Sequence, residues 1–208
     1  KNHFPADLAS SETADLFMSV IMYRLKENGR AAVILPDGFL FGTDNAKMAI
    51  KKKLLSKFNL HSVIRMPHSV FAPYTSITTS ILFFDRTGPT EGTWFYRLDM
   101  PEGYKNFSKT KPLELKHFEP VVAWWNDRQP ICIDEFDKAK CYTAEEIAAR
   151  NYNIDLCGYP HEEEEILPPD ELIRQYQTKR ASLNADIDRI LEQITAILGI
   201  DLTGGNDE

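Results

Sequence analysis

The sequence predicts an open α/β fold, in which a mostly parallel sheet contains one reversed strand, followed by a coiled-coil helix. Helical and strand-like patterns alternate between residues 10 and 66, as in folds built from alternating helices and strands. The connection over residues 67–74 has no helical pattern and is too short for a parallel crossover, so it predicts an antiparallel return. After residue 170, apolar side chains recur at alternating spacings of three and four, which is typical of a coiled coil.

The first helix and the first strand are predicted before residue 36. Ser10 and Ser11 offer an N-cap, and Asn28-Gly29 ends the helix. Between them, apolar side chains recur at helical spacing at Leu16, Phe17, Val20, Ile21 and Leu25. The run of apolar residues over 31–35 predicts a strand buried on both faces. Pro36-Asp37-Gly38 predicts a turn at its carboxyl end.

A second helix and three further strands follow this turn. The helix is predicted over residues 44–58, with Ile50, Leu54 and Phe58 on one face. Four lysines point elsewhere: Lys47, Lys51, Lys52 and Lys57. The three strands are predicted at about residues 62–66, 75–85 and 94–98.

The rest of the first domain is predicted to be a loop and two helical regions. Residues 100–112 are polar and contain glycine, which indicates a loop. Helices are expected near 113–127, where Pro120 forces a break or kink, and over 143–150. Thr143 and Glu146 have capping-box spacing at the start of the latter helix.

Composition divides the chain into a domain over residues 1–157, an acidic linker over 158–170, a coiled-coil helix over 171–198 and a flexible tail over 199–208. The helix would be about 40 Å long at 1.5 Å per residue. Its predicted seam consists of Ile173, Tyr176, Arg180, Leu183, Ile187, Ile190, Ile194 and Ile197. Such a seam favours docking to another protein, and packing against the chain's own core is the alternative.

Composition also limits the classes of function. A chain of 208 residues with 43% hydrophobic and 26% charged residues is typical of a folded soluble protein. Its apolar runs are far shorter than the roughly 18 residues of a membrane span, and no leader pattern opens it, so we expect a cytoplasmic protein without membrane contact. The three cysteines and five histidines lack zinc-ligand spacing, so we expect free thiols and no metal. The net charge of −7 implies that any DNA binding is shared with a partner.

Two motifs carry a resemblance to a known family. Leu35-Pro36-Asp37-Gly38 follows the first strand, and Val70-Phe71-Ala72-Pro73-Tyr74-Thr75 lies in the predicted return. With Trp94-Phe95-Tyr96 and Arg150-Asn151-Tyr152-Asn153-Ile154-Asp155, they resemble the second half of an adenine-specific DNA methyltransferase. The modification subunit of type I restriction-modification systems is the most similar class. The resemblance covers nearly the whole chain, and its strands occur in the family order.

Two motifs of that family do not occur in this sequence. One is the glycine-rich strand-turn that binds S-adenosylmethionine, and the other is the Asn-Pro-Pro-Phe or Asn-Pro-Pro-Tyr loop that holds the flipped adenine. Pro168-Pro169 lies in the acidic linker after a leucine, so we reject it as a catalytic loop. The resemblance therefore implies the C-terminal half of a Rossmann-like methyltransferase domain. It also implies that the cofactor and the catalytic residues belong to a preceding part, and that this chain alone is inactive.

The resemblance implies a site for the extruded adenine base. Phe71 is expected to stack on the base, and Pro73 and Tyr74 to shape the pocket. Asp37 is expected to contact the base or to order the catalytic loop. The alternatives are a core phenylalanine, a surface tyrosine and an Asp-Gly turn.

DNA contacts are expected in the later loop, where Lys105, Lys109 and Lys111 alternate with Tyr104 and Phe107. The alternative for these lysines is an ordinary solvated surface.

The partners and the reaction also follow from the resemblance. It implies docking of the helical seam to a DNA-specificity subunit, a restriction subunit with nuclease and translocase activity, and double-stranded DNA as substrate. The parent protein would transfer a methyl group from S-adenosylmethionine to N6 of adenine. Two other hypotheses are a non-catalytic coiled-coil interaction module and a Rossmann-like methyltransferase acting on RNA or protein.

Overall fold

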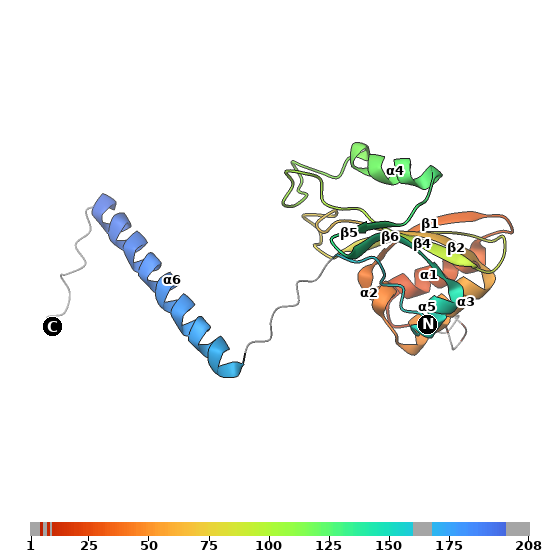
Figure 1. Ribbon diagram of the computed structural model, residues 1–208, viewed down its shortest axis with the longest axis horizontal. Coiled ribbons are helices and arrows are strands. Elements are labelled where there is room, and N and C mark those ends of the chain that lie inside the picture. The colour runs from red at the N-terminus through yellow and green to blue at the C-terminus, as the bar shows by residue number, and fades with distance from the viewer. Residues whose placement is uncertain (1–4, 6–7, 9, 160–167, 199–208) are drawn as a thin grey trace. The chain divides into compact units, whose positions relative to one another are not determined.

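The computed structural model describes Pro5, Leu8 and residues 10–159 and 168–198 (Figure 1). The chain divides into one unit over residues 1–160 and another over 161–208. Most of the expected acidic linker and the whole expected tail lie outside the described residues.

A six-stranded sheet forms the centre of the first unit, in the order β1-β3-β2-β4-β6-β5. β3 pairs antiparallel with both β1 and β2, whereas β2 and β4 are parallel. β6 pairs antiparallel with both β4 and β5. The strands are β1 Arg30–Pro36, β2 Asn59–Arg65, β3 Thr79–Asp85, β4 Gly92–Arg97, β5 Ile131–Ile133 and β6 Phe136–Thr143.

The prediction of a mostly parallel sheet is wrong, because β2–β4 is the one parallel pairing between the described strands. The antiparallel return of β3 onto β2 was predicted, but β3 also separates β2 from β1. The β5–β6 hairpin was not predicted and adds two antiparallel pairings. β1 is an edge strand in this sheet, and Ile34 is half exposed, so β1 is not buried on both faces as expected.

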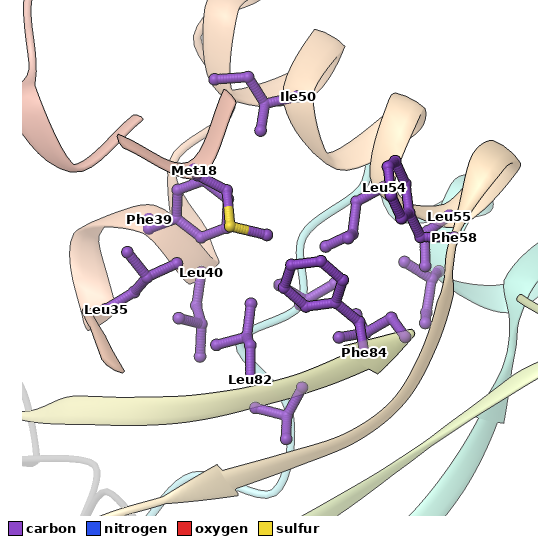
Figure 2. Close-up of a cluster of buried hydrophobic side chains, with 14 of the residues drawn as sticks. Met18, Leu35, Phe39, Leu40, Ile50, Leu54, Leu55, Phe58, Leu82 and Phe84 are labelled. Atoms are coloured by element: carbon purple, nitrogen blue, oxygen red, sulfur yellow. The ribbon is translucent and has the colours of Figure 1, made fainter. Parts of the chain in front are cut away.

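Helices cover both faces of the sheet (Figure 1). One face carries α1 (Thr13–Arg24), α2 (Asp37–Phe41), α3 (Asn45–Lys57) and α5 (Ala144–Ala149), and the other carries α4 (Glu119–Asn126). Figure 2 shows the larger core, where Met18, Phe39, Ile50, Leu54, Leu82 and Phe84 pack between the sheet and its helices. A smaller core under α4 includes Ile64, Tyr96 and Trp124.

Local signals in the sequence explain where the helices begin. The Asp44 carboxylate accepts from the backbone N–H of Lys47 at the start of α3, and Thr143 and Glu146 form the predicted capping box of α5. Pro120 lies in the first turn of α4, where its missing N–H costs nothing. The expected break is the boundary between α4 and the short 3-10 helix Leu115–Phe118. The predicted turn after β1 is the short helix α2 instead.

Four lysines of α3 were expected to point away from the core, but two of them are buried. Lys47 is buried and forms ion pairs with Glu12, Asp15 and Asp44. Lys51 is buried as well, and its ammonium group donates to the carbonyl oxygens of Leu40 and Gly42.

The second unit contains the predicted long helix, α6 (Pro169–Leu198), and none of its residues is buried. The predicted seam is exposed at all its apolar positions: Ile173, Tyr176, Leu183, Ile187, Ile190, Ile194 and Ile197. A coiled coil is not confirmed, so the partner remains a prediction. None of the described helices combines the length and the hydropathy that crossing a bilayer requires.

Candidate functional site

The candidate site lies where three strands end. β1, β2 and β4 run in the same direction, because β1 and β2 both oppose β3, and β2 is parallel to β4. Their last residues, Pro36, Arg65 and Arg97, therefore lie at one edge of the sheet. Open α/β sheets bind ligands at this edge. Asp37 and the loop over residues 66–78, called the aromatic loop below, both begin here.

Asp37 is engaged by the protein at this edge. Its carboxylate accepts from Arg65 Nη2 at 2.7 Å, and the Ser80 hydroxyl lies 3.4 Å from its other oxygen. Its backbone N–H donates to the carbonyl oxygen of Thr78. The side chain is 16% exposed. The role of Asp37 toward a base stays a prediction, and the geometry favours the ordering role over direct contact.

Arg65 is a central residue of the site that the sequence analysis missed. It is buried, and its guanidinium group donates to the carboxylates of both Asp37 and Asp155. Burial would lower the pKa of Arg65, but these two carboxylates outweigh it and raise the pKa above its ordinary value. A signal was present, because an arginine ending the apolar run Val63-Ile64 needs a partner when it is buried.

Asp155 belongs to a segment, residues 154–159, that we call the strap. Ile154 donates to the carbonyl oxygen of Leu40 in α2, and Arg97 Nη1 donates to the carbonyl oxygen of Gly158 at 2.7 Å. The Tyr159 hydroxyl donates to the carbonyl oxygen of Leu98 at 2.6 Å. The strap is therefore fixed to α2 and to the ends of β2 and β4.

The aromatic loop presents its predicted residues to solvent. Phe71 is 38% exposed and Tyr74 is 92% exposed, and Pro73 between them is exposed as well. Turn hydrogen bonds join Ala72 to Ser69 and Tyr74 to Phe71. Phe71 is therefore not a core phenylalanine in this structure. Both rings are available to a flat ligand.

The lysine loop, residues 99–114, contacts the aromatic loop. Phe107 is buried, and its backbone N–H donates to Ser69 Oγ at 2.9 Å. His68 Nε2 lies 2.9 Å from Asn106 Oδ1, within hydrogen-bond distance. The predicted cations Lys105, Lys109 and Lys111 are all exposed, and Lys111 Nζ lies 5.6 Å from the centre of the Tyr104 ring. The structure thus brings together the two loops that carry the predicted base residues and the predicted DNA-contacting lysines.

The site provides groups that can bind an aromatic or an anionic ligand. It combines exposed aromatic rings and ammonium groups with a buried, fully charged arginine. Among the described residues, no cluster of three or more His, Cys, Asp or Glu side chains could hold a metal ion. A mixed α/β sheet, in which β3 and β6 oppose the other strands and an aromatic loop lies at the carboxyl edge, places the chain among methyltransferase-like α/β proteins.

Comparison with known proteins gives the family. The family model described as N-6 DNA Methylase matches residues 2–166, so the chain belongs to that family. It is 42% identical over 207 residues to the methylase subunit of type I restriction enzyme EcoEI from Escherichia coli, covering 98% of this chain and 41% of that protein. It is 32% identical over 117 residues to the EcoKI methylase subunit from E. coli K12, covering 50% of this chain and 21% of that protein.

Solved structures agree with this assignment. A modification subunit of a putative type I restriction enzyme from Vibrio vulnificus YJ016 is 44% identical, with a TM-score of 0.64, over 70% of this chain and 30% of that one. A chain of a type I restriction-modification system, studied for complex assembly, is 31% identical with a TM-score of 0.64, over 93% of this chain and 41% of that one. The predicted resemblance is confirmed. The chain spans about two-fifths of the length of the EcoEI subunit.

Proposed function

We propose that this chain is the base-binding and partner-docking part of a DNA methyltransferase in a type I restriction-modification system. The parent protein transfers the methyl group of S-adenosylmethionine to N6 of adenine. The observation that carries the proposal is the exposed aromatic loop at the carboxyl edge of the sheet, in a chain that belongs to the N-6 DNA methylase family. The family assignment favours DNA over RNA or protein as the substrate.

The aromatic loop suits a base that has left the double helix. Chemistry on an adenine amine requires that the base be extruded and then held by stacking and edge contacts. Phe71 offers a partly exposed ring for stacking, and Tyr74 offers a second, exposed ring three residues further along the loop. Pro73, which is also exposed, lies between them in the sequence and would shape the pocket.

The apolar cavity under α4 and the carboxyl edge of the sheet do not suit S-adenosylmethionine. The most apolar cavity, of about 300 Å³, lies between the sheet and α4 and has one polar lining residue, Asn126. It offers no charged group to the cofactor's amino acid end. At the carboxyl edge, Asp37 and Asp155 are already paired with Arg65. We therefore assign cofactor binding to the other part of the parent protein, and we expect this 208-residue chain to transfer no methyl group alone.

Two further surfaces complete the proposal. The exposed lysines of the lysine loop contact DNA phosphates beside the extruded base, because they adjoin the aromatic loop. The exposed seam of α6 docks to the DNA-specificity subunit, and the restriction subunit joins the resulting complex.

One experiment tests the reaction. The full-length protein and its specificity subunit are expressed in a host without adenine methylation, and the genomic DNA is sequenced for N6-methyladenine. We expect a single recognition sequence to be modified, and none when the 208-residue chain replaces the full-length protein. A full-length complex that methylates only RNA or protein, or nothing, would contradict the proposal.

A second test concerns the base site. Phe71→Ala in the full-length complex should lower kcat/KM for methyl transfer by about 5- to 150-fold, because a stacked base is worth ~1–3 kcal/mol. Ile77→Ala is the matched control, since Ile77 is an exposed apolar residue of the same loop. Methyl transfer by Phe71→Ala within about threefold of wild type would be hard to reconcile with stacking.

A further inference from the structure

Asp37 holds both ends of the aromatic loop. Its carboxylate binds Arg65, the residue immediately before the loop, at 2.7 Å. Its backbone N–H binds the carbonyl oxygen of Thr78, the last residue of the loop. Asp37 thus joins the two ends of the loop, and we call this place, where Arg65 and Thr78 come together, the neck. The arrangement of Asp37, Arg65 and Asp155 is called the neck clamp.

Asp155 completes the clamp from the other side. Its carboxylate binds Arg65 Nη1, while the Asn153 side chain accepts from the Asp155 backbone N–H at 2.8 Å. A side chain at position 158 would crowd the same guanidinium group, since an added Cβ would lie 2.8 Å from Arg65 Nη1. The guanidinium group is therefore held between two carboxylates and a closely packed backbone.

The hydrogen bonds beyond the neck leave the middle of the loop lightly held. From Ser69 to Thr75 the bonds are local turns, apart from the bond between Ser69 Oγ and Phe107. Phe71 and Tyr74 have no hydrogen bond to the sheet in this part of the described structure. The direction in which the rings point consequently depends on the two ends of the loop, together with the contacts of His68 and Ser69 with the lysine loop.

From this geometry we propose that Arg65 is a positioning residue for methyl transfer, fixing the neck of the aromatic loop so that Phe71 meets the extruded base. The inference rests on the proposed function and adds a role for Arg65 and Asp155. Stability alone is a weak explanation for the clamp, because apolar replacements often stabilise a protein as well as a buried ion network does. A displacement of about 1 Å at a reacting group can cost about 100-fold in rate, which gives the clamp a function.

The test uses Asp155→Asn in the full-length protein with its specificity subunit. This substitution preserves shape, removes one charge from the clamp and leaves Asp37 on Arg65. Glu12→Gln is the matched control, because Glu12 is a partly exposed carboxylate bound to the buried Lys47 at 2.7 Å, in another part of the fold. Hydrogen exchange of the 67–78 amides, kcat, and KM for S-adenosylmethionine are measured with DNA carrying the sequence that the wild-type complex modifies.

We expect Asp155→Asn to speed exchange in the aromatic loop and to lower kcat about tenfold or more, with KM for S-adenosylmethionine unchanged. In a Phe71→Ala background the same substitution should have little further effect, because it acts through the loop. Unchanged loop exchange, or a loss of kcat that simply adds to that of Phe71→Ala, would overturn the proposal. The exchange measurement tests the clamp even in a protein that methylates no DNA, so failure of the proposed function is recognised separately.

Discussion

At the scale of single residues, Lys51 is a buried cation that binds carbonyl groups at the end of a helix. Its ammonium group donates to the carbonyl oxygens of Leu40 at 3.0 Å and Gly42 at 2.7 Å, at the carboxyl end of α2. Carbonyl groups at a helix end lack partners within the helix, and a cation is favourable there. Lys51 therefore fixes the end of the short helix whose first residue is Asp37.

Burial gives Lys51 a measurable pH dependence. It lowers the pKa of Lys51 from 10.5 to about 8, so between these values the unfolded chain binds more protons than the folded chain. Stability contributed by this residue is lowest below pH 8 and rises as the pH increases toward 10.5. Between pH 7 and pH 10, the wild-type chain should gain about 2 to 3 kcal/mol in free energy of unfolding relative to Lys51→Met.

Chemical denaturation of the 208-residue chain at the two pH values measures this gain. Lys52→Met is the control, because Lys52 is the exposed neighbour of Lys51 in α3. A gain of the same size relative to Lys52→Met would show that the pH dependence does not come from Lys51.

Lys47, which was predicted to point away from the core, and Arg65, for which no role was predicted, both have partners far away in the sequence. Lys47 pairs with Glu12, 35 positions earlier, and Arg65 pairs with Asp155, 90 positions later. A local pattern reveals neither of these distant partners, although Asp44, three positions before Lys47, also pairs with it. A lysine on a helix is therefore interpreted as solvated by default. The exposed residues Phe71 and Tyr74 were easier to select, since they belong to a short motif.

At the scale of elements, local chemistry decided which predictions succeeded. The capping residues of α3 and α5 lie within three positions of the groups they bind, and both helices were predicted close to their observed bounds. The β5–β6 hairpin lacked such a signal. Ile133 pairs with Phe136 across Asp134 and Glu135, whose φ values are 48° and 68°. Tight hairpins with two positive φ angles usually carry Asn-Gly or Asp-Gly, so Asp-Glu concealed the turn.

The long helix α6 gives an element-scale prediction. Ile187→Asp should weaken binding of the full-length protein to its specificity subunit by at least about tenfold, because it would bury an unpaired carboxylate in the docked seam. The thermal stability of the unit over residues 1–160 should not change, because the substitution lies in the other unit of the chain. Titration calorimetry and a melting curve measure the two quantities.

The control for this prediction is Ala185→Asp, which adds the same charge on the side of α6 opposite the seam. Equal losses of affinity for both variants would indicate a general effect of negative charge, and unchanged affinity for Ile187→Asp would exclude the seam as the docking surface.

At the scale of the whole molecule, strand order rather than strand existence limited the prediction. Four of the six strands were expected, but the position of β3 between β1 and β2 depends on pairings between distant residues. The candidate site survives this error, because β1, β2 and β4 still run in one direction and end at one edge. What was missed at that edge, Arg65 with Asp155, could be found only once β2 and the strap were placed together.

The overall charge leads to the last prediction. A chain with a net charge of −7 repels DNA on average, so its contacts must come from a local group of cations or from a partner. The lysine loop is such a group, because Lys105, Lys109 and Lys111 are exposed beside the aromatic loop. Replacing all three by alanine should weaken DNA binding by the assembled complex for every sequence alike, because phosphate contacts carry no sequence information.

Each phosphate contact that is lost reduces the number of counterions released when the complex binds DNA. The slope of log affinity against log salt concentration should therefore become shallower by about 2 to 3. Fluorescence anisotropy at several salt concentrations measures this slope. Lys52→Ala with Lys57→Ala removes two exposed lysines of α3 and should leave the slope unchanged. If the lysine-loop variant keeps the wild-type slope, the contacts with DNA phosphates belong to the partner subunits. The acidic chain then contributes the base site without binding the phosphate backbone of the DNA.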